Sequence, residues 1–156
     1  MNFKTTIFTL ILLISGFIGW SQQEKYDIKL ANFNSEFSDF SAIIFEGDII
    51  YVSDKNSKTV KNKKDPATKR NFCNLFSDSK NPKIISLLDK INTIYHEGPI
   101  SVSADGNMVF FTRNSFFQKE KRYTDDRVMP LQIFYIKFEN GKWSNEFDFP
   151  VNSTLY

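Results

Sequence analysis

The sequence predicts an all-β fold of repeated antiparallel units that follows an export signal. Three features predict it: an aromatic-rich composition, an internal repeat, and a short apolar run at the N-terminus. Of the 156 residues, 17 are Phe, and aromatic residues make up 16% of the chain, whereas Gly and Pro number only 6 and 5. Aromatic and β-branched side chains suit the pleated, half-buried surface of a sheet. We therefore expect sheets that pack face to face through large side chains.

Residues 1–21 have the pattern of a secretory signal peptide. Lys4 supplies the positive charge, residues 7–18 form an apolar run, and Gly19 and Ser21 provide the small residues of a cleavage site. A membrane span needs about 20 apolar residues, more than this run has. An uncleaved anchor and a core helix or strand are the alternatives. We predict an exported protein of the periplasm or outer membrane, with no membrane span after cleavage.

A short phrase, Asn followed by Ser or Thr, occurs three times at similar spacing. It begins at Asn34, Asn92 and Asn152, which are 58 (92 − 34) and 60 (152 − 92) positions apart. The same order of predicted elements separates successive phrases: a short strand, a turn, a strongly apolar strand, a polar loop, a strand, a turn and a strand. Self-similarity at such a period is typical of solenoids, propellers and arrays.

Turn residues support this reading of the repeat. Asp105-Gly106 and Asn140-Gly141 each predict a tight hairpin turn, because these pairs readily adopt positive φ. Residues 46–48 predict the equivalent turn in the first unit with a weaker signal. Each unit then contains four antiparallel strands.

Four-stranded antiparallel units that repeat in this way are the blades of a β-propeller. We predict a linker at residues 22–32, a first blade at 33–93, and a second blade with the start of the next connector at 94–156. Propellers close with about 4–8 blades, so two blades form an incomplete ring. The chain is therefore predicted to be the beginning of a larger propeller protein or a truncated relative of one.

One segment fits two secondary structures. The apolar residues between Ile84 and Ile94 match a helical face as well as a strand. Pro82 and the similarity of residues 91–93 to residues 151–153 favour a strand, which we predict.

The residues from Pro99 to Asn114 resemble the TolB-like, WD-like β-propeller repeat. Residues 103–106, Ser-Ala-Asp-Gly, stand where that repeat usually has Ser-Pro-Asp-Gly, and Phe134-Tyr135 stands in the next strand. Residues 91–114 are also similar to the propeller portion of exported OmpA-family envelope proteins. The resemblance implies a non-enzymatic scaffold that binds other envelope proteins. In that group peptidoglycan is bound by a separate domain, which these residues do not include.

Composition argues against several other functions. The formal net charge is +2 with Lys4 included, so we predict neither nucleic acid nor an anionic membrane as a partner. Cys73 is the sole cysteine and His96 the sole histidine, which argues against a disulfide or a zinc site. We predict no enzyme, no catalytic residue, no metal and no cofactor. The alternatives are the propeller of a glycan-cleaving enzyme or serine peptidase, although no Gly-x-Ser-x-Gly elbow occurs, and a carbohydrate-binding propeller.

Two charged loops predict a partner-binding rim. They run from Asp54 to Arg70 and from Gln118 to Arg127, and each follows the second strand of its unit. They should therefore lie at one edge of the fold, where propeller loops bind partners. The residues that we expect to contact a partner are Lys61, Lys63, Lys64, Arg70, Lys121, Arg122 and Tyr123. Solvated loops without a partner are the alternative.

Overall fold

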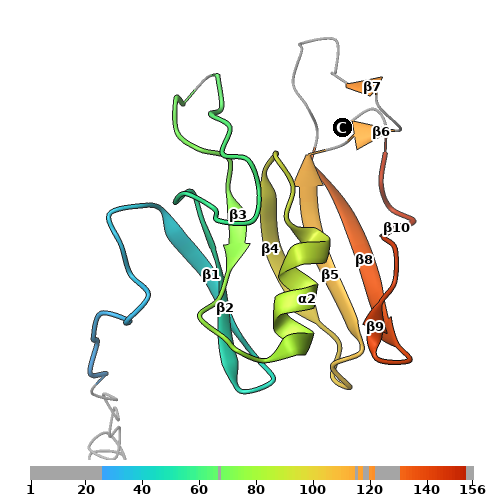
Figure 1. Cartoon of the computed structure of the whole chain (residues 1–156), viewed down its shortest axis with the longest axis horizontal. Helices are drawn as coiled ribbons and strands as arrows, with labels where there is room; N and C mark the ends of the chain where they lie inside the picture. The colour runs from blue at the N-terminus through green and yellow to red at the C-terminus, as the bar shows by residue number, and fades with distance from the viewer. Residues whose placement is uncertain (1–25, 67, 115, 118–119, 122–130, 154–156) are drawn as a thin grey trace, which may run out of the picture. The chain divides into compact units, whose positions relative to one another are not determined.

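The computed structural model describes residues 26–153 apart from residues 67, 115, 118–119 and 122–130 (Figure 1). The predicted signal peptide lies outside the described residues. The chain divides into a short N-terminal unit, Met1–Ala31, and a main unit, Asn32–Tyr156, and the sheets of the described residues lie in the main unit.

The described residues form three antiparallel sheets and one helix, and none of these sheets closes on itself. The first sheet has the order β1 (Asp39–Phe45), β2 (Asp48–Ser53), β3 (Asn74–Phe76). The second sheet has the order β4 (Glu97–Val102), β5 (Met108–Asn114), β8 (Leu131–Glu139), β10 (Phe147–Asp148), and β9 (Lys142–Trp143) pairs with the end of β8. A small third sheet joins β6 (Phe116–Phe117) and β7 (Glu120–Lys121). The helix α2 (Pro82–Ile91) lies between the first and second sheets in the chain.

The fold was predicted to be all-β, and the structure is mostly β with one short helix. The prediction of a strand at residues 82–91 is wrong. Asn81 caps α2, and its side-chain oxygen accepts a hydrogen bond from the Lys83 N–H at 3.0 Å. Pro82 occupies the first turn, where a proline fits a helix because its missing N–H needs no partner there. Ile84, Leu87 and Ile91 lie on one buried face of the helix. The first repeated unit therefore has three strands and a helix, in place of the four strands predicted for an all-β fold.

Three hairpin loops connect the strands. Glu46-Gly47 has φ angles of 52° and 83°, and Asn140-Gly141 has 52° and 76°, as two-residue hairpin turns require. The loop at Asp105-Gly106 is longer, and of this pair only Gly106 has positive φ, at 69°. Its N–H donates to the Ser103 carbonyl at 2.9 Å.

The first sheet and β4, β5 and β8 of the second sheet repeat one another in register. A polar row crosses the start of each sheet: Asp39, Ser53 and Asn74 in the first, Glu97, Arg113 and Gln132 in the second. A register shift follows at the same place in β1 and β4. The two rows therefore define equivalent positions in the two sheets.

The repeated asparagine pairs with the third strand of each sheet. Asn92 Oδ1 accepts from the Leu75 N–H at 2.8 Å, and Asn92 Nδ2 donates to the Leu75 carbonyl at 2.8 Å. Asn152 makes the same two bonds with Ile133, at 2.8 and 2.7 Å. Each side-chain amide thus satisfies two backbone groups as a neighbouring strand would. We call Asn92 and Asn152 the clamp asparagines.

The Ser or Thr after the repeated Asn also has a repeated contact. The Ser35 hydroxyl donates to Asp39 Oδ2 at 2.7 Å, and the Thr93 hydroxyl donates to Glu97 Oε1 at 2.5 Å. Asp39 and Glu97 begin the first strand of their sheets. The phrase seen in the sequence therefore fixes the third strand of one sheet and the first strand of the next.

The two sheets pack with opposite faces toward each other. Ser53 in β2 and Arg113 in β5 are equivalent. The residues just before them are therefore equivalent too: Val52 corresponds to Thr112, and Tyr51 corresponds to Phe111. Val52 and Phe111 belong to the core cluster between the sheets, and their equivalents do not: Thr112 is half-buried, and Tyr51 is buried against Phe33 outside this cluster. Since alternate residues of a strand face opposite ways, the packing is head to tail. The core residues are Phe45, Ile50, Val52, Leu75, Ile84, Leu87, Ile91, Ile100, Val109, Phe111, Phe134, Ile136 and Trp143.

Replacing the clamp tests its contribution to stability. Asn92→Ala leaves the Leu75 N–H and carbonyl without their partner, so we expect the free energy of unfolding to fall by about 1–3 kcal/mol. Asn92→Asp keeps the acceptor but places a charged oxygen against the Leu75 carbonyl at the C-terminal end of α2, so it should be destabilising as well. Urea unfolding measures both. The control is Asn145→Ala, because the Asn145 side chain accepts an exposed hydrogen bond from Lys90. Equal losses for Asn92→Ala and the control would refute the clamp.

Candidate functional site

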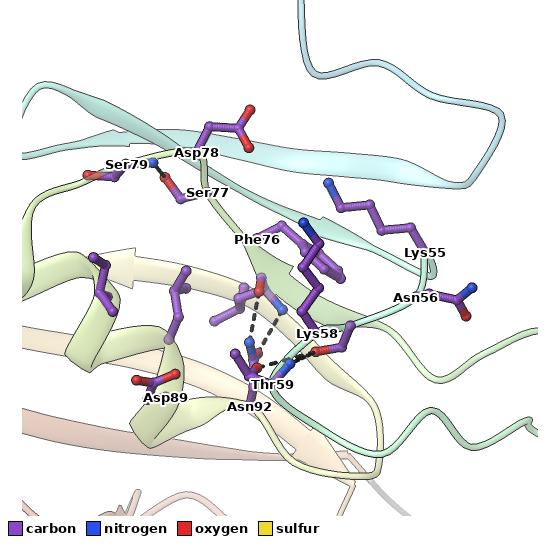
Figure 2. Close-up of a pocket in the computed structure, with 14 residues that line it drawn as sticks. Lys55, Asn56, Lys58, Thr59, Phe76, Ser77, Asp78, Ser79, Asp89 and Asn92 are labelled. Atoms are coloured by element: carbon purple, nitrogen blue, oxygen red, sulfur yellow. Dashed lines mark hydrogen bonds between the residues drawn. The ribbon is translucent and has the colours of Figure 1, made fainter.

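A pocket of about 300 Å³ lies between the loop after β2, the strand β3 and the helix α2 (Figure 2). The loop contributes Lys55 and Lys58, the end of β3 contributes Phe76, and α2 contributes Ile85 and Asp89. The lining is thus mixed: basic on one side, apolar and acidic on the other.

Lys55 is tied to the aromatic wall of this pocket. Its Nζ lies 4.5 Å from the centroid of the Phe76 ring and 4.8 Å from that of Tyr51, and it also donates to the Tyr51 hydroxyl. Such cation–π contacts favour a fixed position for the ammonium group. The Lys55 ammonium group is therefore held in place by the protein itself. Lys58 is the second lysine that lines the pocket.

A buried polar cluster joins the two sheets at their polar rows. Glu97 is fully buried, and its carboxylate accepts from Arg113 Nε at 3.0 Å, from the Thr93 hydroxyl, and from Asn74 Nδ2 at 2.7 Å. Burial raises the pKa of Glu97, while the hydrogen bonds from Thr93 and the Arg113 charge act in the opposite direction. Both carboxylate oxygens have donors, so the cluster is built to hold a charge in place.

Arg113 connects this cluster to other elements. Its Nη1 donates to Glu146 Oε2 at 2.5 Å, and its Nη2 donates to the carbonyl of Ile91 at the end of α2. The guanidinium lies 5.0 Å from the Phe111 ring centroid. The cluster was not predicted from the sequence; its one local signal is that Glu97 and Arg113 stand on either side of the turn predicted at Asp105-Gly106 and pair across β4 and β5.

The structure describes part of the predicted rim. Lys61, Lys63, Lys64 and Arg70 are all exposed in the loop after β2. Figure 1 shows this loop and β7, which contains Lys121, at the same end of the two sheets. The positions of Arg122 and Tyr123 lie outside the described residues.

Two of the rim residues border a shallow depression of about 360 Å³, together with Phe37. These residues are Lys64 and Arg70, and Arg70 is bound to the buried Asp54 through Nη2–Oδ1 at 3.1 Å. Lys63 Nζ lies 5.4 Å from the Tyr95 ring centroid. The rim is thus a basic surface with aromatic rings beside it.

Cys73 and His96 form a pair at the base of the same loop. The Cys73 N–H donates to His96 Nδ1 at 3.0 Å, and His96 Nε2 lies 3.7 Å from Asp65 Oδ2. Burial lowers the pKa of His96, and Asp65 partly offsets this. Burial raises the pKa of the Cys73 thiol to about 11, so it is protonated at neutral pH and is a poor nucleophile.

Over the described ranges, no group of three or more His, Cys, Asp or Glu side chains is placed to hold a metal ion. In the same ranges, no helix has both the length and the apolar character needed to cross a bilayer. Searches against protein-family models, curated proteins and solved structures returned no match.

Removing the cation of the buried cluster should destabilise the fold strongly. Arg113→Met leaves the buried Glu97 carboxylate without its cation, and we expect the free energy of unfolding to fall by about 3–5 kcal/mol. Adding Glu97→Gln should recover part of that loss, because the remaining group is neutral. A double-mutant cycle by urea unfolding measures the coupling. Lys90→Met, at an exposed position of α2, is the control and should change the free energy of unfolding by about 0.5 kcal/mol or less. If Arg113→Met changed it by as little as this control, the proposed role of the cluster would be contradicted.

His96 should make stability depend on pH. Because its pKa is lowered from the ordinary value of 6.5, the unfolded chain takes up the proton first as the pH falls. The stability present above pH 6.5 is therefore lost as the pH falls through the folded-state pKa. NMR of the sole imidazole should give a pKa below 6.5, and His96→Asn should flatten the pH dependence of unfolding below pH 6.5. A measured pKa at or above 6.5 would refute the burial of this ring.

Proposed function

We propose that this chain is an exported, non-enzymatic β-propeller-type module of the cell envelope that binds other envelope proteins through its basic rim. The observation that carries the proposal is the head-to-tail packing of two repeated sheets, each with its clamp asparagine. Propeller blades are four-stranded antiparallel sheets that repeat around an axis. The order β4, β5, β8, β10 fits one blade, and the first sheet fits another in which α2 takes the place of the last strand.

The rim supports a binding role because its charges are available to a partner. Lys61, Lys63 and Lys64 are exposed, whereas the buried Glu97 carboxylate is bound to Arg113. A basic surface of this kind suits an acidic patch on another protein, which it would recognise by complementary charge. Export is supported by the residue pattern of positions 1–21, and the envelope location by the family resemblance.

Site-specific photocrosslinking in the host tests this proposal. The full chain carries a photoreactive residue at position 61, on the rim, or at position 142, which is exposed on the β9 hairpin at the opposite end of the sheets. We expect discrete crosslinks to envelope proteins at position 61, and we expect them to decrease at least tenfold with Lys63→Glu and Lys64→Glu. Position 142 is the control.

Two results would overturn the proposal separately. Unprocessed protein confined to the cytoplasm would refute export. Equal crosslinking at positions 61 and 142, with no effect of the two charge reversals, would refute the rim as the binding surface.

A further inference from the structure

The contact between the two sheets inside the chain leaves one face of each sheet uncovered by the other. The first sheet uses the face of Ile50, Val52 and Leu75, and the second sheet uses the face of Val109 and Phe111. These two faces are not equivalent in the repeat. By register, the open face of the first sheet is therefore equivalent to the core face of the second sheet. The open face of the second sheet is likewise equivalent to the core face of the first.

The open face of the first sheet is apolar. Ile44 and Ile49 are paired across β1 and β2 and are 79% and 43% exposed. Tyr51 and Phe76 continue this face, but Tyr51 is only 2% exposed, because Phe33 stacks on its ring with 4.6 Å between centroids and Lys55 lies over it. By register these residues correspond to the part of the second sheet that is buried in the core.

The open face of the second sheet is aromatic. Phe110, Tyr135 and Phe147 form a row across β5, β8 and β10, with 5.9 Å between the first two ring centroids and 5.1 Å between the last two. Phe147 is 44% exposed, and Val151 nearby in sequence is 67% exposed. Val151 precedes its clamp asparagine as Ile91 precedes Asn92, and Ile91 is fully buried in the core.

A polar contact between the two sheets also has counterparts at the same register positions elsewhere in the repeat. Inside the chain, Asn74 donates to Glu97 of the next sheet at 2.7 Å. By register, the residues equivalent to Asn74 and Glu97 are Gln132 and Asp39. Among the described residues, Gln132 Oε1 and Asp39 Oδ1 are buried and have no hydrogen-bond partner. Both atoms are acceptors, so a bond between these two side chains would run from the second N–H of the Gln132 amide to Asp39 Oδ1. The Gln132 amide already donates to the Ser153 carbonyl as Asn74 donates to Thr93, at 3.1 Å in both.

We propose that copies of this chain bind one another head to tail, with the first-sheet open face of one copy on the second-sheet open face of the next. The contact continues the interface that the two sheets already form within one chain, and it places Asp39 of one copy beside Gln132 of another. A head-to-tail contact produces a ring if its rotation closes and a filament if it does not. This inference is independent of the partner-binding rim.

Two face variants of the full chain test the proposal. The first-face variant carries Ile44→Asp and Ile49→Asp, and the second-face variant carries Phe147→Asp and Val151→Asp. The substituted residues are exposed, and circular dichroism checks that both variants fold. The control is Ile85→Asp, which removes an exposed apolar residue of α2 outside both faces. Sedimentation velocity over a range of concentrations measures the mass of each species.

Head-to-tail binding makes a distinctive prediction for mixtures. The wild type and the control should form species of two or more copies, and each face variant alone should be a monomer. The mixture of the two variants should form a 1:1 dimer and nothing larger, because one intact face remains on each copy. A monomeric wild type, a face variant that associates like the wild type, or a mixture that stays monomeric would each overturn the proposal.

Discussion

The side-chain amide of a clamp asparagine takes the place of a peptide group beside the third strand of each sheet. Asn92 occupies both backbone groups of Leu75, and Asn152 occupies both of Ile133. A buried strand edge with unpaired N–H and carbonyl groups is costly. The clamp removes that cost with a single residue and, since the next strand follows within a few residues, it also sets where the next sheet begins.

The buried ion pair completes this connection between sheets. Glu97 begins the second sheet, yet it binds Asn74 of the first sheet as well as Arg113 of its own. Arg113 in turn reaches the last carbonyl of α2. A buried pair of this kind is weak evidence for added stability, but its donors and acceptors match in only one arrangement. The cluster therefore fixes how the sheets are placed, while apolar packing supplies most of the driving force.

Much of this architecture could be predicted from the sequence because its signals are local. The Asn-[Ser/Thr] phrase marks the clamps, and Asn140-Gly141 marks a turn whose two residues have positive φ. The helix α2 was mispredicted because its apolar spacing fits two periods and Pro82 was interpreted as a strand signal, when it occupies a helix N-terminus capped by Asn81. The Glu97 cluster was missed because its members come from three strands and the segment after α2, and the contact between them depends on how the sheets pack.

The central claim is that two equivalent sheets contact each other through non-equivalent faces. Methyl NOEs in the full chain test it most directly. We expect NOEs from Val109 and Ile136 to methyl groups of the first sheet or α2, such as those of Ile50, Leu75 and Leu87, and none from Ile133, the equivalent of Leu75. NOEs between Ile133 and Leu75 or Ile50 would show that like faces pack together, and the head-to-tail account would be wrong.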